Sequence, residues 1–265
     1  MVHVEEPDAG KRNERGQLCE RDDTGDEGGG APGKRAIEWV YVLHGTSRFA
    51  PSAAAPPRRS ATRVSWRLVF VTFEGADGSG KSTQAELLRA ALAADGREVV
   101  LTREPGGTEL GEAVRTLVLN GPVMGAWAEA TLFAASRAEH VEEVIRPALE
   151  RGADVICDRY VDSSLAYQGL ARGLGVDPVL QLNLAVTGGL LPDVTFLLLL
   201  DPGVASGRHV EPDRLEREGT ELQAKVDAAY RELAERFDKR IVVVDAARAP
   251  QEIAKEVRER LRDRS

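Results

Sequence analysis

Short apolar runs alternate with helical patterns along the chain from about residue 66 onward. The runs are continuously apolar instead of alternating between apolar and polar positions, which is typical of strands covered on both faces. Repeated strands joined by crossover helices predict a parallel five-stranded sheet wrapped by helices. The expected strands are 68–73, 98–102, 154–158, 194–200 and 241–244.

The helical patterns place apolar residues three or four positions apart between these strands. One helix is expected to begin at Asp177 and Pro178, with the Asp177 carboxylate as its cap, and to end at Gly188 and Gly189. The other apolar faces are expected at Ala85, Leu88 and Leu92; at Leu110, Val114, Leu117 and Val118; at Leu222, Val226, Tyr230, Leu233 and Phe237; and at Ile253, Val257 and Leu261.

Residues 1–63 differ in composition from the rest of the chain. The segment begins acidic, passes through three consecutive glycines and ends in Ala, Pro, Ser and Arg, with one short apolar patch at 37–43. This composition predicts a mostly disordered extension before a folded domain at 64–265. Two alternatives stay open: an organelle transit peptide, which the acidic start disfavours, and a true translation start near Val64, which the mass of the native protein would test.

Composition narrows the function classes. The chain has 265 residues, 42% of them hydrophobic, and a formal net charge of -8. That charge argues against general affinity for nucleic acid or for anionic membranes. Only Cys19 and Cys157 carry thiols, which favours a reducing cytoplasm, and no apolar run approaches the ~18 residues of a membrane helix.

The sequence FEGADGSGKST at 73–83 fits the pattern G-x-x-x-x-G-K-[ST] between an expected strand and an expected helix. Glycines let the backbone N–H groups turn inward around phosphate oxygens, and the helix that begins near Lys81 adds the positive end of its dipole. Lys81 can reach the β- and γ-phosphates, and the Ser82 hydroxyl is suited to Mg²⁺. The stretch predicts binding of a nucleoside triphosphate.

Further polar residues follow the ends of other expected strands, where ligands of open α/β sheets gather. Asp158 ends one strand and is suited to act on Mg²⁺ or its waters. Arg103, Arg115 and Arg159 could converge on a second, non-transferred phosphate, because planar guanidinium groups suit phosphate oxygens.

Together with the phosphate loop, five motifs carry a resemblance to a known family. They are TREPGGT at 102–108, LFAASRAEHV at 132–141, DRYVDSSLAYQG at 158–169, PDVTFLLLLD at 192–201 and DRLE at 213–216. In order and spacing the chain from about residue 68 to 261 resembles the bacterial type of the thymidylate kinase family. The resemblance implies transfer of the γ-phosphoryl group of ATP to dTMP, giving dTDP and ADP for DNA replication, with Mg²⁺, by a cytoplasmic enzyme that is usually a homodimer.

The resemblance also implies roles for individual residues. Asp77 would reach the acceptor 3′-hydroxyl, Tyr167 would press on the deoxyribose, and Phe133 would stack on thymine. Taken residue by residue, Phe133 could equally be core and Gln168 a helix-end cap. The implied nucleotide site is Gly75, Ala76, Asp77, Gly78, Ser79, Gly80, Lys81, Ser82 and Thr83; the catalytic set is Lys81, Asp158, Arg159, Arg208 and Arg214; the Mg²⁺ ligands are Ser82 and Asp158; the dTMP site is Asp77, Arg103, Arg115, Phe133, Arg137, Arg159, Ser163, Tyr167 and Gln168.

The sequence departs from the family pattern at a few positions. Ser136 stands where an Asp is common, Ala171 stands where a Gly is common, and the expected lid at about 203–216 is short. Neither Ser136 nor Ala171 carries an implied contact with the transferred group. The apolar helix at 126–135 could form a dimer interface or belong to the core.

Three other interpretations compete. A nucleotide-driven switch protein is one, although the guanine-reading motif N-K-x-D of a GTPase does not occur. A nucleoside kinase would need a carboxylate base, for which Glu104 is a candidate, but the arginines favour an acceptor that already carries a phosphate. A binding protein with an inactive site is the third, and intact Lys81, Ser82, Asp158 and Arg159 argue against it.

The phosphate loop reads Asp77-Gly78-Ser79 and contains no arginine, so a lid arginine is expected to close over the phosphates. We predict that Arg208→Ala or Arg214→Ala lowers kcat by orders of magnitude, because charge that develops on the transferred group loses its partner. Steady-state kinetics of the two single variants checks this. Wild-type turnover in both would refute the assignment.

Overall fold

The computed structural model describes residues 69–200 and 219–264. The expected N-terminal extension and the expected lid, with Arg208 and Arg214, lie outside the described residues.

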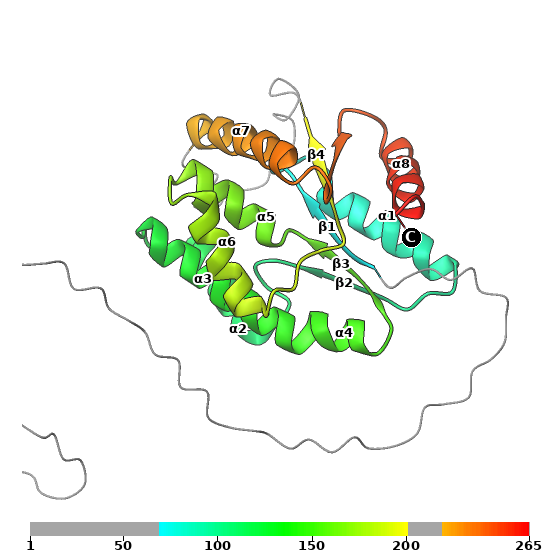
Figure 1. Ribbon diagram of the computed structural model, residues 1–265, viewed down its shortest axis with the longest axis horizontal. Coiled ribbons are helices and arrows are strands. Elements are labelled where there is room, and N and C mark those ends of the chain that lie inside the picture. The colour runs from blue at the N-terminus through cyan, green and yellow to red at the C-terminus, as the bar shows by residue number, and fades with distance from the viewer. Residues whose placement is uncertain (1–68, 201–218, 265) are drawn as a thin grey trace, which may run out of the picture. The chain divides into compact units, whose positions relative to one another are not determined.

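The described residues form one parallel sheet with helices on both faces (Figure 1). The strand order is β2-β3-β1-β4-β5, and every neighbouring pair is parallel. This confirms the predicted fold class, a P-loop type of α/β sheet. The strands are β1 Phe70–Glu74, β2 Val99–Arg103, β3 Asp154–Asp158, β4 Val194–Leu199 and β5 Ile241–Asp245.

Helices α1 and α8 lie together on one side of the sheet, and α3 to α7 lie on the other (Figure 1). Two segments, η1 and η2, are π-helical, and the sequence pattern did not predict them. The helices are α1 Lys81–Ala94, α2 Glu109–Asn120, α3 Ala126–His140, η1 Val141–Ile145, α4 Arg146–Glu150, α5 Val161–Ser164, η2 Leu165–Ala171, α6 Val176–Thr187, α7 Thr220–Arg236 and α8 Pro250–Arg262.

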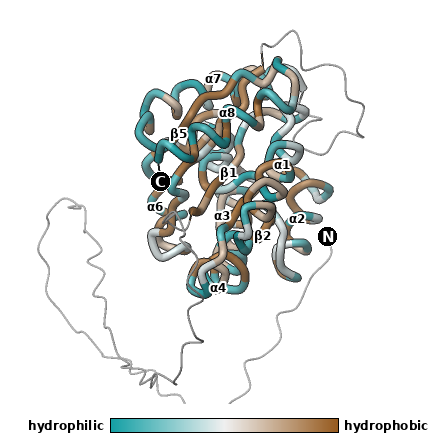
Figure 2. Tube along the Cα trace, turned by 90° about the vertical axis from the view of Figure 1, so that its right-hand side faces the viewer, coloured by the Kyte–Doolittle hydropathy of each residue, from teal (hydrophilic) through white to brown (hydrophobic). Residues whose placement is uncertain are grey.

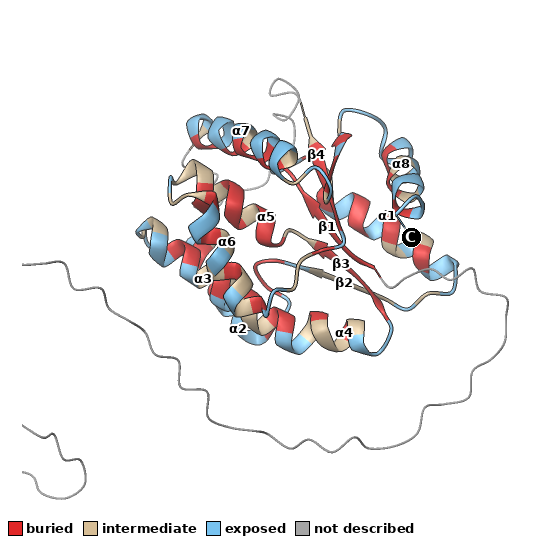
Figure 3. Ribbon diagram, in the orientation of Figure 1, coloured by how far each residue is buried: buried red, intermediate tan, exposed pale blue. Residues whose placement is uncertain are grey.

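The two faces of the sheet carry separate apolar clusters, because successive side chains of a strand point to opposite faces. Val71 and Phe73 of β1 pack with α1 and α8, whereas Phe70 packs with the helices of the other layer. The buried segments follow the sheet and the inner sides of the helices (Figure 3), and Figure 2 shows the hydrophilic colour along much of α8. Glu74 of β1 points to the same face as Phe70, so its hydrogen-bond partners must come from the layer of helices that covers Phe70.

The prediction that all strands are covered on both faces is correct for the central strands and wrong for the edges. Every residue of β1 is buried, but β2 is only partly buried and Val243 of β5 is 47% exposed. An edge strand has a neighbour on one side alone, so fewer helices reach across it.

Two helix predictions also need correction. Helix α6 begins at Val176 after Gly175, and no side chain caps it, so Asp177 lies inside the first turn and pairs with Arg236 instead. On α2, Val114 and Val118 are buried as expected, but Leu110 and Leu117 are almost half exposed. The left-handed Gly188 ends α6 as predicted.

In the two stretches that the structure describes, we find no helix that is both long and apolar enough to cross a membrane.

Candidate active site

The loop between β1 and α1 has the backbone of a phosphate-binding nest. Gly75 adopts φ 136°, and a Cβ there would stand 2.3 Å from the carbonyl oxygen of Leu198, so only glycine fits. Gly80 precedes α1 with φ 94°, and neither a capping side chain nor an acidic residue occupies the first turn of the helix. The N–H groups of that turn are thus available to an anion.

Lys81 is buried at the start of α1, and its Nζ donates to the carbonyl oxygen of Ala76 at 2.7 Å. Burial, together with the neighbouring positive charge of Arg159, lowers its pKa to about 8, although Asp77 and Asp158 oppose the shift. Bound phosphate would oppose it as well, because a nearby negative charge favours the ammonium form.

Ser82 of α1 and Asp158 at the end of β3 are brought together by the pairing of β3 with β1. The Ser82 hydroxyl donates to Oδ2 of Asp158 at 2.5 Å. A hydroxyl and a carboxylate oxygen at one point fit Mg²⁺, a hard cation that takes its remaining ligands from water and phosphate.

A cavity opens beside the phosphate loop and gathers most of the residues expected to bind the acceptor. Its lining comes from the loop after β1, the loop after β2, α2, α3 and the segment after β3. The lining residues are Asp77, Glu104, Pro105, Arg115, Leu119, Phe133, Arg137, Arg159, Tyr160, Ser163, Ser164, Tyr167 and Gln168.

Arg159 connects the cavity to the phosphate loop. Its guanidinium donates to Oδ1 of Asp77 at 2.5 Å and to the hydroxyls of Ser163 and Tyr230 at 3.2 Å. This arginine holds the pKa of Asp77 below its usual value. The backbone of Arg159 is left-handed, with φ 69°, a conformation that non-glycine residues seldom adopt outside functional sites.

Arg115 and Arg103 differ in their surroundings. Arg115 of α2 lines the cavity and donates to the carbonyl oxygen of Pro105. Arg103 is exposed, pairs with Glu112 at 2.8 Å and is not among the residues that line the cavity. The structure therefore brings Arg115 and Arg159 together at the cavity but not Arg103.

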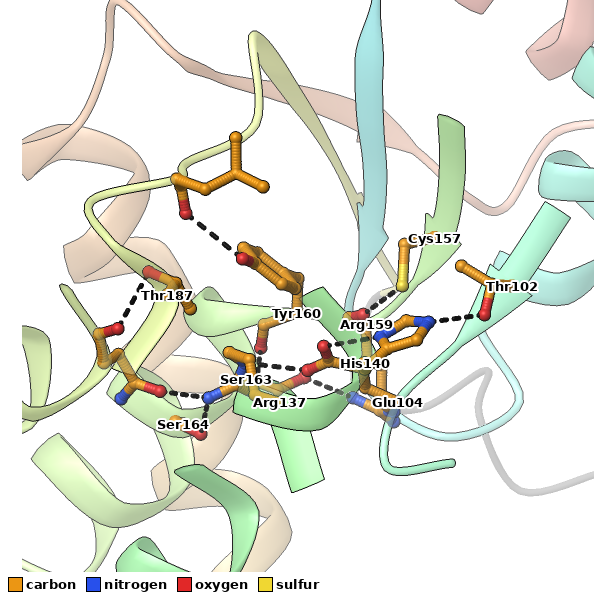
Figure 4. Close-up of polar contacts among 12 residues, drawn as sticks. Thr102, Glu104, Arg137, His140, Cys157, Arg159, Tyr160, Ser163, Ser164 and Thr187 are labelled. Atoms are coloured by element: carbon orange, nitrogen blue, oxygen red, sulfur yellow. Dashed lines mark hydrogen bonds and ion pairs between the residues drawn. The ribbon is translucent and has the colours of Figure 1, made fainter. Parts of the chain in front are cut away.

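Arg137 is fully buried and uses four of its five N–H groups within the protein (Figure 4). Its Nε donates to Oε2 of Glu104 at 2.7 Å, and Nη2 donates to the carbonyl oxygen of Tyr160. Nη1 donates to the Ser164 hydroxyl and to the side-chain oxygen of Asn183. One N–H of Nη2 remains for a ligand of the cavity.

Both carboxylate oxygens of Glu104 have hydrogen-bond partners. Its other oxygen, Oε1, lies 2.9 Å from Nδ1 of His140, whose Nε2 meets the hydroxyl of Thr102 at 2.6 Å (Figure 4). With both oxygens engaged by buried partners, Glu104 is poorly suited to take a proton from a substrate.

Gln168 lies in η2 at the cavity and is 1% exposed. Its amide nitrogen donates to Oε1 of Glu129 at 2.9 Å, so it does not cap a helix end. Phe133 lies on α3 between Glu129 and Arg137, four residues from each, and all three belong to one helix face. Phe133 is partly exposed into the cavity, not simply core.

Glu74 is a site residue that the sequence reasoning missed. It is buried at the end of β1, where it accepts from the Ser163 hydroxyl at 2.6 Å and from the Tyr230 hydroxyl at 2.9 Å. Burial, together with the nearby Asp162, raises its pKa to about 7, although Arg159 opposes the rise. A charged residue that ends an apolar strand just before the phosphate loop was the available signal.

Other residues missed by sequence reasoning are Glu129, His140, Asn183 and Tyr230. Glu129 could have been found, because it stands four residues before Phe133 on the same helical face. His140 lies on α3 three residues after Arg137, but its partner Glu104 stands 36 residues earlier. Asn183 and Tyr230 contact site residues from segments far apart in the sequence, which no local pattern indicates.

A P-loop beside a cavity with further arginines, on this sheet order, defines the class of P-loop kinases that act on nucleoside monophosphates. A family model described as thymidylate kinase matches residues 73–257. The chain belongs to the thymidylate kinase family.

Named relatives agree with this family. The chain is 52% identical to the thymidylate kinase of Bifidobacterium longum over 188 residues, covering 68% of this chain and 91% of the relative. It is 52% identical to that of Leifsonia xyli subsp. xyli, covering 73% and 94%. A crystal structure of thymidylate kinase from Ehrlichia chaffeensis shares 35% identity with a TM-score of 0.61, covering 73% of this chain and 98% of that one.

The buried Glu104–Arg137 pair generates a stability prediction. Glu104→Gln should lower the free energy of unfolding by about 3–5 kcal/mol, because a buried guanidinium loses its counter-charge. Urea unfolding at neutral pH measures the change. The matched control is Glu98→Gln, which removes the partner of Arg151 at the surface and should cost less than about 1 kcal/mol. Equal losses in the two variants would contradict the prediction.

Proposed function

We propose that this chain transfers the γ-phosphoryl group of ATP to dTMP, giving dTDP and ADP. Membership of the thymidylate kinase family carries the proposal, and the cavity beside the phosphate loop supports it. We assign the ATP phosphates to Gly75, Ala76, Asp77, Gly78, Ser79, Gly80, Lys81, Ser82 and Thr83.

The acceptor phosphate belongs, in this proposal, with Arg115 and Arg159, and Asp77 reaches the 3′-hydroxyl. Thymine then lies against Phe133, the remaining N–H of Arg137 donates to its O4, and Gln168 meets its N3. Tyr167 contacts the deoxyribose, and its ring lies 5.8 Å from the guanidinium carbon of Arg159. We keep Ser163 in the site as the hydroxyl that links Arg159 to Glu74. Arg103, which pairs with Glu112, is the weakest member of the proposed phosphate site.

Phosphoryl transfer needs no protein nucleophile, because the acceptor is already an anion. The work of the protein is to hold donor and acceptor in line and to neutralise charge. Lys81 and the N–H groups of α1 would hold the donor phosphates, and Arg159 would hold the acceptor. Ser82 and Asp158 would bind Mg²⁺, which when present neutralises charge on the phosphate oxygens.

A phosphorylated acceptor fits the site better than a nucleoside. A kinase that phosphorylates a hydroxyl needs a base, and the candidate base Glu104 has both oxygens bound by Arg137 and His140. Two arginines at the cavity instead suit a phosphate.

We further propose that the protein is a cytoplasmic homodimer. Each copy would have one kinase domain at 64–265, with a lid at about 203–216 that supplies Arg208 or Arg214. Half-exposed Trp127 on α3 and Leu117 on α2 are apolar residues that a second copy could cover. Light scattering after gel filtration tests the dimer, and a monomer at micromolar concentration would overturn it.

Coupled ADP release with ATP and Mg²⁺ tests the reaction. We expect turnover with dTMP to exceed turnover with thymidine by orders of magnitude, because thymidine lacks the phosphate that the arginines bind. Turnover with thymidine but not dTMP would overturn the acceptor assignment. ADP release that no acceptor stimulates would favour a nucleotide-binding protein without this activity.

The lowered pKa of Lys81 predicts the pH dependence of ATP binding. Above about pH 8 the Lys81 amine of the ligand-free protein loses its charge, so binding must take up a proton and affinity for ATP should fall as pH rises. Titration with a non-hydrolysable ATP analogue from pH 7.5 to 9.5 measures this. Lys81→Arg stays charged and should lose the dependence, and a flat wild-type profile would contradict the assignment.

A further inference from the structure

We propose that Glu129 is a specificity-determining residue: it fixes the amide of Gln168 so that the oxygen, not the nitrogen, faces the acceptor base. The inference rests on the proposed function and concerns which bases that site accepts.

Glu129 is the buried acceptor that the Gln168 amide meets. It is 1% exposed on α3, and its Oε1 accepts from Nε2 of Gln168 at 2.9 Å. Arg172 donates to both carboxylate oxygens of Glu129, with its Nη2 at 3.1 Å from Oε2 and its Nε at 3.3 Å from Oε1. Both carboxylate oxygens therefore act as acceptors, and a carboxylate paired with a guanidinium in this way offers no proton to Gln168.

The orientation of Gln168 follows from that chemistry. If the amide were reversed, its oxygen would face the carboxylate oxygen, two acceptors would meet inside the protein, and the Gln168 oxygen would have no donor there. Such a buried mismatch is strongly disfavoured, because the Gln168 oxygen loses its hydration without gaining a donor. Glu129 therefore selects the orientation in which the amide nitrogen points away from the cavity.

The amide oxygen is the group left for a ligand. Gln168 lines the cavity, and in the part of the chain that the structure describes no group donates to its Oε1. Arg137, which also lines the cavity, can only donate to a ligand, through its remaining N–H. For the acceptor base, Gln168 thus offers an acceptor and Arg137 offers a donor.

This pair discriminates between pyrimidines. Thymine and uracil present an N3–H donor beside the O4 acceptor, which matches Gln168 and Arg137. Cytosine presents an N3 acceptor beside an N4 amino donor, which opposes both. A reversed Gln168 would turn its nitrogen toward N3 and would accept cytosine at that position. The discrimination by Gln168 between thymine and cytosine therefore depends on the Glu129 carboxylate, which fixes the orientation of the amide.

The test compares kcat/KM for dTMP, dUMP and dCMP in wild type and in two variants. In Glu129→Gln, the new amide can present either its oxygen or its nitrogen to Gln168. In Glu129→Met, the side chain presents no oxygen acceptor to Gln168. We expect the ratio of kcat/KM for dTMP over dCMP to fall at least about tenfold in both variants. The ratio for dTMP over dUMP should stay within about twofold, because both bases carry N3–H.

Glu142→Gln is the matched control, since it removes an exposed carboxylate shortly after α3 and should leave both ratios unchanged. Thermal unfolding identifies any variant that does not fold, and the ratio in the folded variant then decides. Wild-type selectivity between dTMP and dCMP in a folded Glu129 variant overturns the role of Glu129. Failure of the wild-type protein to phosphorylate dTMP overturns the proposed function instead.

Discussion

The burial of one guanidinium holds the acceptor side of the molecule together. Arg137 of α3 donates hydrogen bonds to a carboxylate after β2, to a carbonyl oxygen after β3 and to a side-chain amide oxygen on α6. Three segments that are separate in the sequence therefore meet at α3. A buried positive charge is tolerated only when it is paired and most of its donors find acceptors. The walls of the cavity are therefore placed by electrostatic necessity as much as by apolar packing.

The two halves of the site are built by different means. The phosphate loop depends on backbone shape: Gly75 fits where a side chain would strike Leu198, and α1 presents uncapped N–H groups. The acceptor half depends on side chains that are held by other side chains, such as Arg159 by Asp77 and Tyr230. Substitutions in the first half should thus act on the backbone, and those in the second should act through hydrogen bonds.

Local chemistry explains which features the sequence could predict. Short stretches of sequence determine the central strands, the phosphate loop and the helix face shared by Phe133 and Arg137, and the sequence predicts all three. The partners of Arg137 were not, because Glu104 and Asn183 stand 33 and 46 residues away and only the fold joins them. The exposure of Val243 depends likewise on the strand order, which residue periodicity does not contain.

The π-helical turns of η2 carry an evolutionary consequence. Such turns hold an extra residue, so a one-residue deletion within 165–171 would restore ordinary α-helical bonding at little cost to the backbone. The flanking helical residues would stay in register, because the π-turn absorbs the extra residue, but the residues within 165–171 would be redistributed around the helix. Tyr167, Gln168 and Arg172 could not all keep their directions. Insertions and deletions here would change substrate choice while the helix itself survived, which makes this segment a natural place for related kinases to diverge.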